Sequence, residues 1–118
     1  MIEQMNYFIM PGLHEAFPDG KPARETILKI IASEKKVNLE HILTKTRNSD
    51  IVEARFIYIK LVKQVYNMTK VSIGRELGKD HTTIIHALKQ FENRFKYEES
   101  FRHTTNKICV RLGIKLNN

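Results

Sequence analysis

The sequence predicts an all-α fold, a compact bundle of about six helices within residues 21–118. Apolar residues recur three and four positions apart over most of this stretch, which is the period of a helix that buries one face. Residues that begin or end helices, such as Asn, Asp, Thr and Gly, stand between these periodic segments. A chain of 118 residues suffices for one domain with a modest core.

Residues 1–20 are expected to form an irregular N-terminal arm, because prolines and glycines interrupt them. Pro22 then suits the first turn of a helix that reaches about Lys36, since that turn does not need the missing N–H. Asn38 is expected to cap a short helix that ends at Leu43 or the next residue. A polar loop follows.

The longest predicted helix runs from Asp50 to about Tyr66 and is apolar over most of its circumference. Ser49 is expected to cap it, with Asp50 in the first turn opposing the helix dipole. Its β-branched residues would also suit a strand, but a strand of this length without a breaker is uncommon. Because a helix that is apolar all round must be buried, other helices are expected to surround it.

A short helix, a three-residue turn and a longer helix come next. Thr69 is expected to cap the short helix, which ends at Gly78 because glycine tolerates a positive φ. Asp80 is expected to cap the longer helix, which reaches about Tyr97. The buried stripe of that helix comprises Ile84, Leu88, Phe91 and Phe95. A last helix is expected from about Glu98 to Gly113. Its inward-facing residues are Phe101, Thr105, Ile108 and Leu112.

Charge is unevenly distributed along the chain. Residues 1–20 contain three acidic residues and no Lys or Arg, so their net charge is −3. All 20 basic residues lie in residues 21–118 beside ten acidic ones, which gives that part a net charge of +10. A basic domain favours a polyanionic partner, most commonly nucleic acid. The alternative is a soluble domain that is basic without such a partner.

Several classes of protein do not fit the sequence. Residues 1–13 lack the basic start of a secretory signal, and no window approaches the roughly 20 apolar residues of a membrane span. The single cysteine, Cys109, cannot form an intrachain disulfide, which fits a reducing cytoplasm, and is expected to be a core thiol. No metal is expected, because His81 and His86 lie about 140° apart around a helix and other histidines have no ligand cluster nearby.

The residues that follow the three-residue turn have the chemistry to reach base edges in a DNA major groove. A short helix, a turn and a longer helix form the layout of a helix-turn-helix, whose second helix presents its first residues to bases. Threonine can touch a thymine methyl and hydrogen-bond to either base type, and His81 can donate to a purine N7 or a phosphate. Asp80 can cap the helix or accept from a cytosine amino group. The alternative is that Asp80, Thr82 and Thr83 only begin a helix of the bundle.

This stretch resembles the C-terminal DNA-binding domain of the bacterial replication initiator DnaA. The matching motifs are Ile73-Gly74, Leu77-Gly78 and Asp80-His81-Thr82-Thr83-Ile84-Ile85-His86-Ala87. The similarity covers roughly residues 25–112. It implies a Trp-repressor-like, all-α fold containing a helix-turn-helix, and sequence-specific binding of double-stranded DNA in replication initiation, its regulation or transcription control.

The resemblance also implies roles for individual residues. Arg47 matches an arginine that the family inserts into the minor groove, where such a residue senses A·T-rich narrowing. Arg55 and Lys63 match basic residues that grip phosphates. For Arg47 the alternative is a solvated loop residue, and for Arg55 it is an ion pair with Glu53 or another acid. The residues that match the family's major-groove contacts are Asp80, His81, Thr82 and Thr83. His86 matches a contact to the DNA backbone.

The sequence departs from the family pattern at two places. Gly78-Lys79 stands where the family has Gly-Gly-Arg, so at Lys79, also an expected DNA contact, a point charge replaces the bidentate fork of an arginine. Ser49, Asp50 and Glu53 occupy a stretch where the family has basic residues, and Ala54 stands at a proline position. The preferred DNA box is therefore left open.

The ATPase of the initiator is not predicted in this chain. A phosphate-binding loop needs four residues between its glycines and a final Ser or Thr, whereas the nearest segment, residues 74–80, has three and ends in Asp. We therefore expect no nucleotide, no cofactor and no enzymatic activity. The chain is either a free-standing relative or a piece of a longer protein, and the acidic arm favours the former. A cytoplasmic, nucleoid-associated location is expected.

A second hypothesis is a protein-interaction module that docks on a replication or plasmid factor and touches DNA little. Residues 1–20 and an exposed apolar patch would then carry binding. Charge reversal at Arg47 and Lys63 would have no effect in that case.

Overall fold

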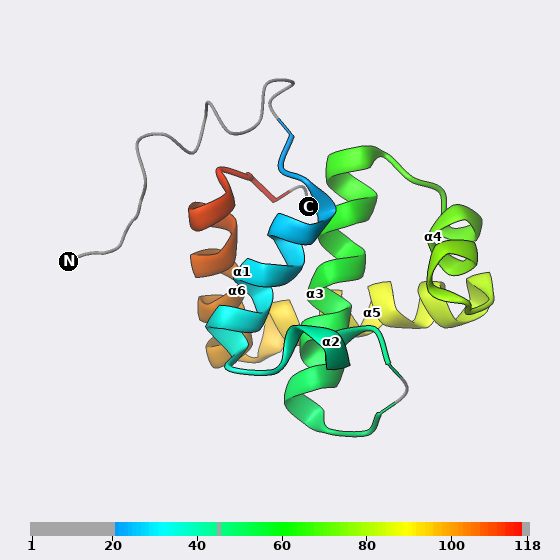
Figure 1. Ribbon diagram of the computed structural model, residues 1–118. Coiled ribbons are helices and arrows are strands. Elements are labelled where there is room, and N and C mark those ends of the chain that lie inside the picture. Colours follow the sequence, from blue (N-terminus) through cyan, green and yellow to red (C-terminus); the bar gives the residue numbers. More distant parts are fainter. Residues whose placement is uncertain (1–20, 45, 117–118) are drawn as a thin grey trace.

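The computed structural model describes residues 21–44 and 46–116, and all regular secondary structure in these residues is helical (Figure 1). The expected all-α bundle of about six helices is confirmed. The predicted arm, residues 1–20, lies outside the described part. The helices of the described residues are α1 (Arg24–Lys35), α2 (Leu39–Ile42), α3 (Ser49–Tyr66), α4 (Lys70–Leu77), α5 (His81–Tyr97) and α6 (Glu99–Leu112).

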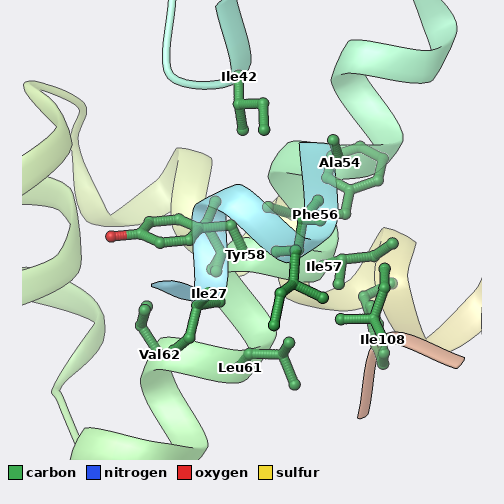
Figure 2. Packing of buried hydrophobic residues seen from close by; sticks show 14 of the residues in the cluster. Ile27, Ile42, Ala54, Phe56, Ile57, Tyr58, Leu61, Val62 and Ile108 are labelled. Atoms are coloured by element: carbon green, nitrogen blue, oxygen red, sulfur yellow. The ribbon is translucent and has the colours of Figure 1, made fainter. Parts of the chain in front are cut away.

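Helix α3 lies at the centre of the bundle. Helices α1, α2, α4 and α5 all pack against it, and α6 packs against α1 and α5. In Figure 2, Ile27 of α1 and Ile108 of α6 belong to the same cluster as Ile57 and Leu61 of α3. The prediction that other helices surround this apolar helix is confirmed. Its buried residues are Ile51, Ala54, Phe56, Ile57, Tyr58, Ile59, Leu61 and Val62.

Aromatic rings join α5 to α6. The ring of Phe91 stacks on that of Phe95 at 5.7 Å and meets that of Phe101 edge-on at 5.5 Å. Phe91 and Ile84 are buried as expected, whereas Leu88 and Phe95 are half-buried at the edge of the core. The four residues of α6 expected to face inward are all buried. The hydroxyl of Thr105, the buried polar one among them, donates to the Phe101 carbonyl at 2.8 Å.

The helix ends follow the predicted caps with two exceptions. Asn38, Thr69 and Asp80 are N-caps, and Gly78 and Gly113 end their helices with φ of +69°. The prediction of Ser49 as the cap of α3 is wrong by one residue. The side-chain oxygen of Asn48 accepts from the N–H groups of Asp50 and Ile51 at 3.0 and 3.2 Å, so Asn48 is the cap and α3 begins at Ser49.

Pro22 does not lie in the first turn of α1, which is the second correction. Helix α1 begins at Arg24 with Ala23 as its N-cap. Pro22 is buried, and its carbonyl accepts a hydrogen bond from the hydroxyl of Tyr66 at the end of α3. This contact ties the chain to α3 just before the helix starts.

Gly74 sets how closely α4 approaches the start of α5. It is buried inside α4, and its carbonyl accepts a hydrogen bond from the N–H of Lys79 at 2.7 Å. A Cβ atom at Gly74 would lie 2.5 Å from the carbonyl oxygen of Lys79, closer than real Cβ contacts allow. The absence of a side chain here therefore lets the turn fold back and places Asp80 at the start of α5.

We expect Gly74→Ala to lower the free energy of unfolding by about 1–2 kcal/mol. Alanine in a helix interior gains up to about 1 kcal/mol over glycine, but crowding against a backbone oxygen costs about 1–3 kcal/mol. Urea denaturation measures the change. Gly113→Ala is the comparison variant: unlike Gly74, Gly113 has a positive φ and open space around it, so its loss of about 1 kcal/mol reports backbone strain without crowding. A Gly74→Ala variant as stable as the wild type would contradict this account of the turn.

Candidate nucleic-acid interface

Helix α5 presents one face to the core and the opposite face to solvent at its N-terminal end. Ile84 and Ala87 are buried on the inner face. The predicted site residues of the first turns, His81, Thr82, Thr83 and His86, are all exposed. In Figure 1 this end of α5 lies beside α4, at the far side of α3 from α1 and α6. The start of α5 is therefore accessible to a large partner.

Asp80 is the structural anchor of this helix start. One carboxylate oxygen, Oδ1, accepts from the backbone N–H of Thr83 at 2.9 Å and from its hydroxyl at 3.1 Å. The N–H and then the hydroxyl of Thr83 hold the pKa of Asp80 below its ordinary value. Asp80 is exposed and ionised at neutral pH, so the tip of α5 combines a negative charge with the positive end of the helix dipole.

The two threonines at this tip have different hydrogen-bonding freedom. The hydroxyl of Thr83 donates its proton to Asp80, so it can only accept from a further group. The hydroxyl of Thr82 has no hydrogen bond to any described residue and can donate or accept. The hydroxyl of Thr82 is therefore free to donate or to accept a hydrogen bond, while Thr83 offers mainly its methyl group.

Arg55 does not make the ion pair that sequence reasoning offered as the alternative. Its Nε donates to the carbonyl of Ile42 at 2.9 Å, and a terminal nitrogen donates to the carbonyl of Thr44. Glu53 is instead bound by Lys35 of α1 at 2.6 Å and by Arg94 of α5 at 2.8 Å. Burial lowers the pKa of Arg55, although an arginine remains charged at any ordinary pH.

The other predicted basic residues lie on three separate segments, the α2–α3 loop, α3 and the turn before α5. Arg47 is exposed in the loop between α2 and α3, Lys63 is half-buried on the last turns of α3, and Lys79 is half-buried in the turn before α5. None of the three has an acidic partner among the described residues. Figure 1 shows that the α2–α3 loop and α4 both extend away from α1 and α6.

Basic residues on other faces are mostly paired with acids. Glu34 on α1 binds Lys107 and Arg111 of α6, and Lys60 on α3 binds Glu92 of α5 at 2.9 Å. On α4, the turn and α5, the basic residues that have no acidic partner within the described part are Lys70, Arg75, Lys79, Lys89 and Lys96. Six others, Lys36, Arg47, Arg55, Lys63, Arg102 and Lys115, lie outside these elements. The helix-turn-helix thus carries uncompensated positive charge from its first helix to its last turn.

Sequence reasoning missed Lys70, which a simple signal could have found. It is exposed in the first turn of α4, where no acidic residue accompanies it. The positive end of the helix dipole lies here, so a lysine is unfavourable unless an anion is nearby. A cation at the N-terminus of a helix therefore indicates a position suited to a phosphate.

Other site classes find no support in the described residues. No helix among them is long and apolar enough to cross a membrane, and they contain no group of three or more metal-ligating His, Cys, Asp or Glu residues. Cys109 is buried, and burial raises the pKa of its thiol to about 11. This agrees with the prediction of a core thiol.

We expect an NMR titration to give Asp80 a pKa below about 3.9, the value in unfolded peptides. Because folding lowers this pKa, ionised Asp80 stabilises the fold above about pH 4, and the contribution is lost as the pH falls through the folded value. Thr83→Val removes the hydroxyl bond but keeps the N–H bond, so it should raise the pKa partway. Thr82→Val, whose hydroxyl does not bond Asp80, is the control. An unchanged pKa in Thr83→Val would refute the hydroxyl contact.

The chain is similar in sequence to a part of bacterial chromosomal replication initiator proteins. The chain is 36% identical over 78 residues to the chromosomal replication initiator protein DnaA of Aquifex aeolicus, which covers 65% of this chain and 20% of that protein. It is 31% identical over 111 residues to DnaA of Nautilia profundicola, covering 92% and 26%. DnaA 2 of Chlamydia pneumoniae is 34% identical over 82 residues, covering 70% and 18%. The chain thus spans about a fifth to a quarter of these relatives.

A family model described as the bacterial DnaA protein helix-turn-helix matches residues 24–90. That range contains α1 to α4, the turn that follows and the exposed start of α5. It also contains Arg47, Arg55 and Lys63, and every predicted site residue of the turn and α5. The chain therefore belongs to the family of the bacterial DnaA helix-turn-helix domain.

Proposed function

We propose that this chain binds double-stranded DNA sequence-specifically, in replication initiation, its regulation or transcription control. The observation that carries the proposal is the exposed start of α5, where Asp80 caps the helix through Thr83 and leaves Thr82 and Thr83 exposed, in a member of this family. The relatives are named as chromosomal replication initiators. Membership in their helix-turn-helix family supports DNA as the partner.

The start of α5 enters the major groove in this proposal. Its slim polar residues fit between the strands, and helices of this kind contact base edges with their first residues. The hydroxyl of Thr82 hydrogen-bonds to a base, and the methyl of Thr83 packs against a thymine methyl. His81 donates to a purine N7 or a phosphate, and His86 reaches a phosphate one turn later.

Phosphate contacts supply most of the affinity, and base contacts supply discrimination. Lys79 carries uncompensated charge directly before α5, Lys63 carries it on the last turns of α3, and Lys70 stands at the N-terminus of α4, which also favours an anion. Arg47 enters the minor groove next to the recognised box, where a narrow A·T-rich groove attracts arginine. The protein would thereby contact phosphates and the minor groove in addition to the bases that α5 reads.

Selection from a random duplex pool is expected to enrich one short box with an A·T-rich flank. Against that box, Thr82→Val should weaken binding by about 1–3 kcal/mol and change binding to unrelated duplexes little, because a base contact is lost. Thr83→Ala should likewise weaken binding to the selected box and change binding to unrelated duplexes little, because the threonine methyl group is lost. Thr82→Ser keeps the hydroxyl and serves as the matched control. Equal losses on selected and unrelated duplexes would reject base readout by these residues.

The salt dependence of binding tests the phosphate contacts. If about five phosphates are neutralised, log affinity falls with log salt at a slope of about −4 to −5. Lys63→Ala should weaken selected and unrelated duplexes equally and make the slope shallower by about 0.9. Lys36→Ala, an exposed lysine away from the helix-turn-helix, is the control and should change neither.

The competing function, a protein-interaction module, makes the opposite prediction. Val110 on α6 is 79% exposed and is the kind of apolar residue that such a module would use. The N-terminal arm, the other candidate surface for a protein partner, lies outside the described residues. Charge reversal at Arg47 and Lys63 abolishes duplex binding under the proposed function and leaves partner binding intact under the alternative.

A further inference from the structure

We infer that Arg55 is a positioning residue, which holds the loop between α2 and α3 so that Arg47 is presented to the minor groove. The inference rests on the proposed DNA binding and assigns Arg55 a role other than gripping a phosphate. The starting observation is that its guanidinium already binds two carbonyl groups, those of Ile42 and Thr44. These carbonyls lie 13 and 11 residues before Arg55 in the chain.

Arg55 provides the two carbonyls with a partner from outside their own segment. Helix α2 has four residues, so its last carbonyls cannot be satisfied by further helical turns. The planar guanidinium supplies donors in a fixed fork, and two of them meet the end of α2 and the loop beyond it. Arg55 thus joins the start of the loop to the second turn of α3.

The other end of the loop is held independently. Asn48 caps α3 with its side chain, and its own N–H donates to the hydroxyl of Thr46 at 3.3 Å. Arg47 stands directly beside this cap, and its side chain has no partner among the described residues. Hydrogen bonds thus hold the end of α2 and the residues next to the cap of α3, while Arg47 itself is exposed. Fixing a loop in its bound shape lowers the entropy that binding must remove.

A phosphate contact would make different demands on Arg55. Its side chain is half-buried, and at least two of its five donors point into the protein. A phosphate needs mainly a positive charge, which lysine also supplies. Holding two separate carbonyls needs the fork, which lysine lacks. Replacing Arg55 by lysine therefore distinguishes the two roles.

The test compares Arg55→Lys, Arg55→Gln, Arg47→Ala and the double variant Arg47→Ala/Arg55→Gln. The probes are the duplex selected by the wild-type chain and the same duplex with its A·T flank replaced by G·C. We expect Arg47→Ala to bind the selected duplex about tenfold more weakly and to lose the preference for the A·T flank. Both Arg55 variants should lose that preference too, and the double variant should be no weaker than Arg47→Ala.

Two results would overturn the inference. Arg55→Lys could retain wild-type affinity while Arg55→Gln makes the salt slope shallower by about 0.9, which is the signature of a phosphate contact. Alternatively, the losses in the double variant could add, which would show that the two arginines act independently. Lys63→Ala is the matched control, since it should weaken both duplexes equally and leave the flank preference unchanged.

A measurement on the wild-type chain keeps the inference testable if the Arg55 variants unfold. The Nε–H proton of Arg55 should be protected from solvent exchange without DNA, and its NMR signal should move little when duplex is added. The corresponding signal of Arg47 should gain protection only with duplex. Protection of Arg55 that appears only with DNA would refute the positioning role. A chain that protects Arg55 but binds no duplex would instead refute the proposed function.

Discussion

Burial of the apolar residues of α3 is the constraint from which the rest of this structure follows. A helix with Ile57, Leu61 and Val62 wholly buried can exist in water only when other helices cover it. Helices α1, α2, α4 and α5 do so, and α5 must turn its apolar face toward α3. Its polar residues then face solvent. The exposure of Thr82 and Thr83 is thus a consequence of how the core is filled.

Ion pairing divides the surface into two kinds of region. Around α1 and α6, acids such as Glu34 neutralise neighbouring cations, and Glu53 joins α1, α3 and α5 through two partners. Around α4 and the start of α5, lysines stand without acidic partners in the described residues. The paired charges hold helices together, whereas the unpaired ones remain for a polyanion. The same residue types therefore join helices in one region and would serve recognition in another under the proposed function.

Local patterns in the sequence predicted most helices and caps, because each depends on residues within a few positions. The apolar period located α3 and α5, and the caps at Thr69 and Asp80 followed from side-chain chemistry. The cap of α3 was misplaced by one residue, since Asn48 and Ser49 are both good caps and only geometry decides between them. The exposed tip of α5 was also predictable. The partners of Arg55 and Glu53 were not, because they join segments that only the fold brings together.

The ionised carboxylate of Asp80 stands exposed where α5 would meet a duplex. Every docking geometry that set it against a phosphate would place two negative charges side by side, which is costly. Geometries that turn it toward a base amino group avoid that repulsion. The residue that caps the helix would thus penalise wrong registers on the DNA, and part of the selectivity would come from what the tip repels.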